Sequence, residues 1–281
     1  MFKLISGKKV LSLDIPRVMG IVNVTDDSFY EGSRSLKASS FQQRIDQMVL
    51  AGADIIDIGG QSTRPGSIQI GAEEEILRVA PAIEYSRRKY PDVWISIDTY
   101  HSSVASHAIS LGADIINDVS GGEKDDQMIP LAGKLNIPYI CMHMQGSPEY
   151  MQQNPSYHDV CDEVFSFFVK KIKQCTDAGI GMLILDQGYG FGKTNDHNYQ
   201  LLANLNRFTT LGYPLLVGVS RKSMIHRVLN TDPEHALNGT SILHSIALMN
   251  GANILRVHDV LEAKECIVLT ERIKAQLKKE P

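Results

Sequence analysis

The sequence lacks the segments that would direct a chain into a membrane or out of the cell. Its first residues contain no long apolar stretch of the signal-peptide kind, and no run of about 18 apolar residues is present to span a bilayer. Cysteine is also scarce, because the 4 residues of this type lie far apart without a C-x-x-C pair. This excludes a disulfide framework and a cysteine zinc site. We therefore expect a protein of the reducing cytoplasm, without a membrane partner.

An excess of positive charge is absent too. The chain has 28 lysines and arginines against 32 aspartates and glutamates, a net charge of -4. Because nucleic-acid binding needs basic residues gathered on one face, we expect no nucleic-acid partner, and any bound anion must be held by a few local groups. No low-complexity linker or charge block divides the chain, so residues 1–281 are expected to form one domain.

What the sequence does contain is a series of short apolar runs rich in valine and isoleucine. Continuous runs of this length are typical of parallel strands that are covered on both faces, because a half-exposed strand would alternate apolar and polar residues. There are eight such runs, at residues 17–23, 54–58, 93–97, 114–119, 137–142, 182–185, 214–219 and 253–257.

Segments with helical spacing separate these runs. Residues 76–83 and 164–172 each place apolar side chains three, four and seven positions apart. Eight repeats of strand and helix allow an open doubly wound sheet or a closed barrel, and the count of eight favours the (β/α)8 TIM barrel. Two short apolar stretches in residues 2–14 flank Ser6-Gly7-Lys8 and predict an N-terminal β-hairpin that closes the bottom of this barrel.

Nearly every apolar run ends in a polar residue. Any one of these, such as Asp98 or Asn117, has an ordinary structural explanation as a helix cap or a turn residue. In a barrel, however, the carboxyl ends of all strands meet at one rim, where catalytic groups sit. Carboxylate, carboxamide, ammonium, guanidinium and imidazole groups would then share that rim. The strand-end residues are Asn23, Gly59-Gly60, Asp98, Asn117, His143, Asp186, Ser220-Arg221-Lys222 and Arg256-Val257-His258.

The motifs around these ends form an ordered set. The first is Met19-Gly20-Ile21-Val22-Asn23-Val24-Thr25 with Asp27-Ser28-Phe29, and the second runs from Asp57 to Gly66 as DIGGQSTRPG. Six more follow as SIDT from Ser96, NDVSGG from Asn117, MHM from Met142, GYGFGKT from Gly188, GVSRKS from Gly218 and RVHD from Arg256. In this order, over about residues 17–260, the set resembles the signatures of the dihydropteroate synthases.

The resemblance implies a transferase of folate biosynthesis. The family condenses 6-hydroxymethyl-7,8-dihydropterin diphosphate with 4-aminobenzoate, so both partners are small molecules, and the products are 7,8-dihydropteroate and pyrophosphate. The pterin ring would be held by Asp98, Asn117, Asp186 and Lys222. A carboxylate suits this task because it accepts two N–H bonds from a guanidine-like edge. The residues expected to be catalytic are Lys222, Asp98, Asp186 and Arg64.

The resemblance also implies a site for the diphosphate and one for 4-aminobenzoate. The diphosphate would be bound by Thr63, Arg64, Arg256 and His258, and Asn23 would be a ligand of the cofactor Mg2+. Magnesium keeps most of its waters, so it needs few protein ligands. The 4-aminobenzoate pocket would be formed by Pro65, Phe191, Ser220, Lys222 and Ser223, with loops at residues 25–36 and 61–71 closing over it. The family further implies a homodimer through outer helices and competition by sulfonamides.

Four residues depart from the family pattern, namely Asp26, Glu31, Gln61 and Gln187. Two alternatives remain at this stage. A corrinoid-class pterin-binding methyltransferase would share the barrel but needs no diphosphate site. Arg64, Arg256 and His258, which would form such a site, therefore argue against this alternative. A catalytically silent pterin-binding homologue would bind pterin without releasing pyrophosphate, and the altered loops would be its mark.

Overall fold

The computed structural model describes residues 2–24, 34–61, 69–146, 150–151 and 154–277, and for residues 34–40 it gives only the course of the helix. Two short strands, β1 (Lys3–Ser6) and β2 (Lys9–Ser12), come first and pair antiparallel. Gly7 turns the chain between them with a positive φ of 57°, which glycine adopts without steric cost. The predicted hairpin is confirmed.

Eight parallel strands follow and close into a barrel in the order β10-β3-β4-β5-β6-β7-β8-β9. Each predicted apolar run contains one of them, displaced by one or two residues at some ends. The predicted (β/α)8 TIM barrel is therefore confirmed. The strands are β3 (Arg17–Asn23), β4 (Ile55–Gly59), β5 (Trp94–Asp98), β6 (Ile115–Asp118), β7 (Tyr139–Met142), β8 (Leu183–Asp186), β9 (Leu215–Val217) and β10 (Ile254–Val257).

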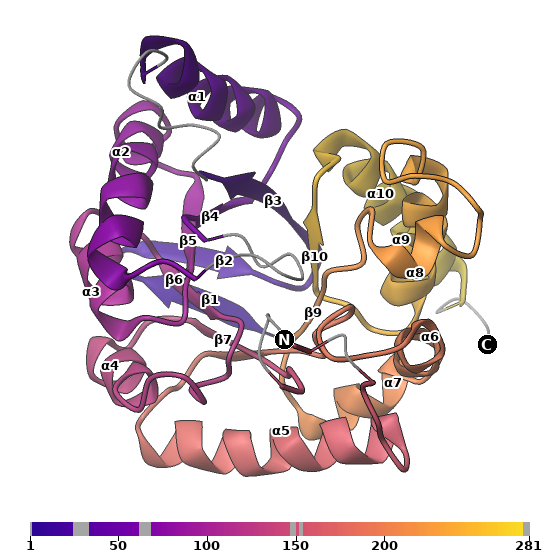
Figure 1. The fold of residues 1–281 in the computed structure, drawn as a ribbon. Helices are drawn as coiled ribbons and strands as arrows, with labels where there is room; N and C mark the ends of the chain where they lie inside the picture. Colours follow the sequence, from indigo (N-terminus) through magenta and orange to yellow (C-terminus); the bar gives the residue numbers. More distant parts are fainter. Residues whose placement is uncertain (1, 25–33, 62–68, 147–149, 152–153, 278–281) are drawn as a thin grey trace.

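Helices surround the barrel (Figure 1). The two predicted helical segments lie inside α2 and α5, and Val79, Ile83, Val164 and Phe168 of these segments pack into the core. Helix α1 begins at Arg34, so the end of the segment expected as a loop at 25–36 is helical. The helices are α1 (Arg34–Leu50), α2 (Ala72–Lys89), α3 (Ser102–Ser110), α4 (Met128–Leu135), α5 (Val160–Asp177), α6 (Asn195–Ala203), α7 (Leu205–Phe208), α8 (Ser223–His226), α9 (Leu237–Met249) and α10 (Val260–Leu277), with a 3-10 turn at Thr209–Leu211.

The barrel interior changes character along its axis. At the amino end of the strands, Leu4, Leu11 and Leu13 of the hairpin segment pack against a buried apolar layer, so the hairpin closes this end as predicted. Nearer the carboxyl ends, inward positions are buried carboxylates. Asp57 lies two residues after Ile55 on β4, and Asp98 lies four residues after Trp94 on β5. The inward layer beneath consists of Met19, Ile55, Trp94, Ile115, Ile140, Ile184, Leu216 and Ile254.

None of the helices in the described ranges is long and apolar enough to cross a membrane.

Candidate active site

The carboxyl ends of four neighbouring strands, three of them with a polar residue, lie side by side at the open end of the barrel. In the strand register Asn23 is opposite Gly59, Gly59 is opposite Asp98, and Asp98 is opposite Asn117. Residues opposite one another in a parallel sheet point to the same face, and in this row that face is the barrel interior. A Cβ atom at Gly59 would lie 3.6 Å from Oδ2 of Asp98 and 3.7 Å from Oδ1 of Asn23. Glycine therefore leaves space between these two side chains.

Arg256 on β10 joins two carboxylates of this region. Its Nε donates to Oδ2 of Asp57 at 2.6 Å, and Nη2 donates to Oδ2 of Asp98 at 2.5 Å. The same oxygen of Asp57 accepts a hydrogen bond from Nδ2 of Asn117 at 3.1 Å. Asp57 is completely buried, and its Oδ1 has no hydrogen-bond partner within the described part of the chain. Asp57 thus links a residue predicted for the pterin to one predicted for the diphosphate.

Negative charge is in excess around Asp98. Burial raises the pKa of Asp98 to about 7, and the Asp57, Asp118 and Asp186 carboxylates add to the rise while Arg256 opposes it. Glu75 of α2 is also buried, and burial together with the Asp98 charge raises its pKa to about 7. Among the described residues, the guanidinium of Arg256 is bonded to two of these carboxylates, Asp57 and Asp98. New hydrogen-bond donors that enter this end of the barrel would find acceptors there.

Asp186 and Lys222 form the opposite side of the same opening. Oδ1 of Asp186 accepts the backbone N–H of Gly188 at 2.8 Å. Burial raises the pKa of the Asp186 carboxyl, whereas Lys222 opposes the rise. Burial lowers the pKa of Lys222 to about 8, against the attraction of Asp186. Nζ of Lys222 donates to the carbonyl of Tyr189 at 2.5 Å and lies 4.8 Å from the ring centroid of Phe191. The ammonium group thus lies between a backbone carbonyl and an aromatic face, and the Asp186 carboxylate attracts it without a direct contact.

Ser220 and His258 meet where β9 and β10 end. The backbone N–H of His258 donates to Oγ of Ser220 at 3.1 Å, and that Oγ lies 3.1 Å from Nδ1 of His258. Burial and the positive charges of Arg256 and Arg44 lower the pKa of His258 to about 4. The imidazole is therefore neutral at pH 7. If Ser220 donates to Nδ1, the ring proton is on Nε2, which can then donate to an anion.

Lys193 is a site residue that the sequence reasoning missed. Its side chain is buried, and Nζ donates to the carbonyls of Gly188 and Phe191 at 3.0 Å each and lies 3.0 Å from Nδ1 of His143. Gly188, with a φ of 67°, permits this packing because a Cβ there would come within 1.9 Å of the His143 carbonyl oxygen. Lys193 thus fixes the loop that carries Phe191 against the end of β7.

Asp57 was missed for a different reason. It lies within an apolar run, and only its inward position, two residues after Ile55, distinguishes it from a structural residue. The alternation of inward and outward residues along β4 was the available signal. Lys193 has no comparable signal, because a lysine in a glycine-rich loop is usually exposed to solvent.

Several predicted residues lie outside the described residues. They are Thr63, Arg64 and Pro65 of the second loop and Asp26 and Glu31 of the first. Ser223 is described and begins α8, directly after Lys222. Gln61 and Gln187, two residues that depart from the family pattern, are buried, and Oε1 of Gln61 and both amide atoms of Gln187 lack a partner among the described residues.

The side chains present fit a magnesium ion only if the substrate supplies other ligands. Within the described ranges, no group of three or more His, Cys, Asp or Glu side chains is arranged to hold a metal ion. Asn23 offers an uncharged oxygen at the exposed end of β3, close to Asp98. Such a hard oxygen suits Mg2+, which commonly binds through few protein groups together with phosphate oxygens and water.

Comparisons with known proteins agree on one group of enzymes. A family model described as pterin binding enzyme matches residues 19–258. The chain is 44% identical to the dihydropteroate synthase of Escherichia coli (strain K12), over 96% of this chain and 95% of that protein. It superposes with a TM-score of 0.91 on the Yersinia pestis dihydropteroate synthase in complex with a sulfonamide drug, at 41% identity over 98% of this chain and all of the other. The Xanthomonas albilineans dihydropteroate synthase with 4-aminobenzoic acid gives a TM-score of 0.90 at 38% identity, over 97% of this chain and 98% of the other.

Proposed function

The chain belongs to the dihydropteroate synthases of the pterin-binding enzyme family, and on this premise we propose how its residues share the reaction. The enzyme is a transferase of folate biosynthesis. It condenses 6-hydroxymethyl-7,8-dihydropterin diphosphate with 4-aminobenzoate and releases 7,8-dihydropteroate and pyrophosphate. The observation that carries the assignment of roles is the gathering of Asp98, Asp186, Lys222 and Arg256 at one end of the barrel, from strands far apart in sequence.

The pterin ring would be held by Asp98, Asn117, Asp186 and Lys222. Two of these groups are carboxyls with a raised pKa, which marks them as acceptors that lack sufficient donors in the enzyme alone. The N–H groups of the aminopyrimidine edge would supply those donors. A charge-assisted pair of this kind is shorter and stronger than a neutral one. Pterin binding would therefore lower the pKa of Asp98 and remove a proton from it at neutral pH.

The diphosphate would be bound by Arg256 and His258, together with Thr63 and Arg64. Two of the five N–H donors of Arg256 are engaged by Asp57 and Asp98, so donors remain for phosphate oxygens. The neutral His258 would donate through Nε2. Because Asp57 holds Arg256 from below, it would act as a positioning residue for the anion site. Magnesium would be held by Asn23 and phosphate oxygens, and it would neutralise negative charge on the leaving pyrophosphate.

The 4-aminobenzoate would lie near Phe191, Lys222 and Ser223, with Pro65 from the second loop. Contact between Lys222 and the ring of Phe191 supports this position, because a ring and an ammonium group together suit an aromatic carboxylate. Ser220 is bonded to His258, so it would have to give up this contact to reach the same substrate. The amine of 4-aminobenzoate is neutral at pH 7, and therefore no general base is required. Sulfonamides would compete with this substrate.

The homodimer would form through α9 and α10. These helices lie next to one another on the outside of the barrel (Figure 1) and expose large apolar side chains in helical spacing. Water contact with such a surface is unfavourable, so a second copy of the chain would cover it. Sedimentation should give a mass of twice 31.1 kDa, and a species of 31.1 kDa would contradict the dimer. The exposed residues are Ile242, Ile246 and Met249 on α9 and Leu261, Val268, Leu269, Ile273 and Leu277 on α10.

We also propose that residues 1–281 act as one pterin-binding domain in the cytoplasm. The hairpin β1–β2 supports the single domain because its leucines complete the layer that fills the barrel. The four cysteines support a reducing compartment because all are free and buried in the folded chain.

Release of pyrophosphate tests the function directly. The protein is mixed with the pterin diphosphate, 4-aminobenzoate and Mg2+, and pyrophosphate and 7,8-dihydropteroate are measured. Equal amounts of both are expected, with activity lost in a chelator and restored by Mg2+. Pterin binding without pyrophosphate release would indicate a silent homologue, and full activity in chelator would remove magnesium from the scheme.

A further inference from the structure

Arg221 stands between two site residues, Ser220 and Lys222, but its own side chain does not serve the substrates. Its backbone has a φ of 54°, in the left-handed region that residues other than glycine rarely adopt. The backbone N–H donates to Oγ1 of Thr240 on α9 at 3.1 Å. Such a conformation costs free energy and persists where surrounding contacts enforce it, which is typical of functional sites.

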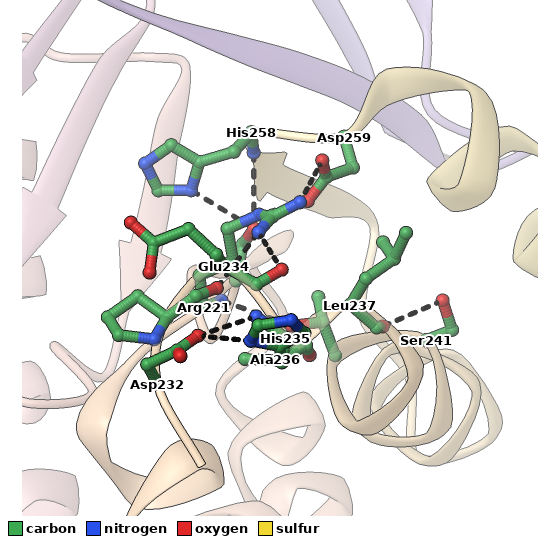
Figure 2. A network of polar contacts seen from close by, with 12 residues as sticks. Arg221, Asp232, Glu234, His235, Ala236, Leu237, Ser241, His258 and Asp259 are labelled. Atoms are coloured by element: carbon green, nitrogen blue, oxygen red, sulfur yellow. Dashed lines mark hydrogen bonds and ion pairs between the residues drawn. The ribbon is translucent and has the colours of Figure 1, made fainter.

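The guanidinium of Arg221 is committed to contacts within the protein (Figure 2). Nε and Nη2 donate to the two carboxylate oxygens of Asp259 at 2.7 and 2.8 Å, a bidentate pair. Nη1 donates to the carbonyls of Pro233 and Glu234 at 2.8 Å each. Four of its five N–H donors are thereby used, and Asp259 neutralises its charge. Arg221 is therefore unsuited to bind an anionic substrate, in contrast to Arg256.

These contacts connect two turns that carry site residues. One is the turn after β9, with Ser220, Arg221 and Lys222, and the other is the turn after β10, with His258 and Asp259. The pair between Arg221 and Asp259 is one link, and the hydrogen bonds between Ser220 and His258 are the second. Two links fix both the distance and the relative rotation of the turns, which a single link would leave variable.

We propose that Arg221 and Asp259 form a clamp that positions Lys222 and His258 for the transfer step. The proposal rests on the function given above, since the groups positioned are those assigned to the substrates. The clamp makes no contact with substrate, so Arg221 and Asp259 are positioning residues. Its effect is expected at the turns after β9 and β10, because Asp98 and Asn117 lie on β5 and β6, where Asp98 is bonded to Arg256 and Asn117 to Asp57.

The variant Arg221→Asn tests the guanidinium without disturbing the backbone. Asparagine tolerates the left-handed conformation, so only the side-chain contacts of the clamp are lost. We expect kcat/KM for 4-aminobenzoate to fall by about 100-fold, the effect that a displacement of about 1 Å has on a positioned reaction. Binding of 6-hydroxymethylpterin without the diphosphate should weaken by less than about tenfold, since the carboxylates on the other strands remain in place. Asp259→Asn should reproduce both results in a weaker form.

Arg207→Asn is the matched control. Arg207 is also paired with an aspartate, Asp162, but on the surface between α7 and α5, with side-chain exposures of 44% and 62%. This variant should keep its turnover. The clamp is refuted if kcat/KM of Arg221→Asn stays within about threefold of this control, or if pterin binding is lost as completely as turnover. If Arg221→Asn does not fold, Asp259→Asn is judged by the same two measurements. An inactive wild-type protein would refute the proposed function instead, which keeps the two failures distinct.

Discussion

The two ends of the barrel differ in the number of cationic partners that their carboxylates have. At the amino end, Asp114 accepts hydrogen bonds from Lys9 and Arg87 at 2.6 Å each, and from the backbone N–H of Ile95 at 3.0 Å. Asp54 similarly forms ion pairs with Nζ of Lys264, at 2.5 Å from Oδ2, and with Nη1 of Arg17, at 3.2 Å from Oδ1. Each carboxylate there has two cations, so its charge is more than balanced.

At the carboxyl end the described carboxylates share a cation instead of having two each. The single guanidinium of Arg256 is shared by Asp57 and Asp98, and Asp186 lies near Lys222. The pKa of Asp98 rises to about 7 because burial and its acidic neighbours outweigh Arg256. The described carboxylates at the amino end therefore have their partners within the protein, and we propose that a ligand supplies further donors to those at the carboxyl end. This division matches the general separation of stability and catalysis between the two ends of such barrels.

Asp98→Asn should produce the largest effect on function. The amide cannot accept two N–H bonds from the pterin edge, so a loss of about 3 to 4 kcal/mol in transition-state stabilisation is expected, a fall in kcat/KM of roughly 100- to 1,000-fold. The free energy of unfolding at pH 8 should not decrease, because the substitution removes a carboxylate that is ionised at a cost. Steady-state kinetics and urea unfolding of the same sample measure both. Reduced stability with unchanged kcat/KM would reverse the assignment of this end.

Asp114→Asn is the counterpart at the amino end. It should lower the free energy of unfolding by about 2 kcal/mol, a value reduced from that of a buried pair because Lys9 and Arg87 are each 24% exposed. The melting temperature should fall by about 5 °C in a protein of this size. The kcat of the folded variant should equal that of the wild type. A loss of turnover without a loss of stability would show that the two ends are not separable in this way.

The dependence of kcat/KM on pH should sharpen the comparison. In the proposed roles Asp98 accepts from the pterin when it is ionised and Lys222 acts as a cation, so activity should rise through the pKa of Asp98, about 7, and fall through the pKa of Lys222, about 8. Glu75 and Lys193 also have a pKa of about 7, so the variant Asp98→Asn is needed to show which group causes the rise in activity. Asp98→Asn should abolish the rise and keep the fall. Persistence of the rise in Asp98→Asn would assign it to another group.

The contribution of Asp98 to the stability of the folded protein has the opposite dependence on pH from its contribution to activity. Its pKa is raised above 3.8, so the folded state binds the proton more tightly than the unfolded state between pH 4 and 7. Its contribution to stability is therefore largest below pH 4 and is lost as the pH rises through 7. The difference in unfolding free energy between wild type and Asp98→Asn should become less favourable to the wild type over this range.

Gln187→Leu should give the smallest effect. The amide of Gln187 is fully buried, and neither of its polar atoms has a partner within the part of the chain that is described. An apolar side chain of similar size removes this cost, so the free energy of unfolding should rise by about 1 kcal/mol with little change in kcat. Urea unfolding measures the gain, and a loss of stability would indicate a partner for the amide, such as a buried water.

The strands and the location of the site were predictable because they follow from local pattern and one rule of topology. Eight apolar runs gave the strands, and the convergence of their carboxyl ends placed Asp98, Asn117 and Asp186 together. The inward position of Asp57 follows from the alternation along β4, but its pairing with Arg256 was not predictable, because the two residues are 199 positions apart and only closure of the barrel brings them into contact.

Burial decided the other differences. Lys193 and Arg221 have the sequence context of exposed loop residues, yet Lys193 is buried among carbonyl groups and Arg221 is fixed by Asp259. Gln61 and Gln187 differ from the family pattern in sequence, but nothing in that pattern indicates that both side chains are buried. Local sequence predicts which residues end a strand, whereas the partners of a long polar side chain depend on packing between distant segments.

The most direct test is whether pterin binding releases a proton. Titration calorimetry of wild type with 6-hydroxymethylpterin at pH 7, in two buffers of different ionisation enthalpy, measures the protons exchanged. Since the pKa of Asp98 is about 7 in the enzyme alone and should fall when the ring donates to it, release of about half a proton is expected, and Asp98→Asn should release almost none. Binding without proton release, or with equal release from both proteins, would contradict the view that this end of the barrel has carboxylates which the substrate completes.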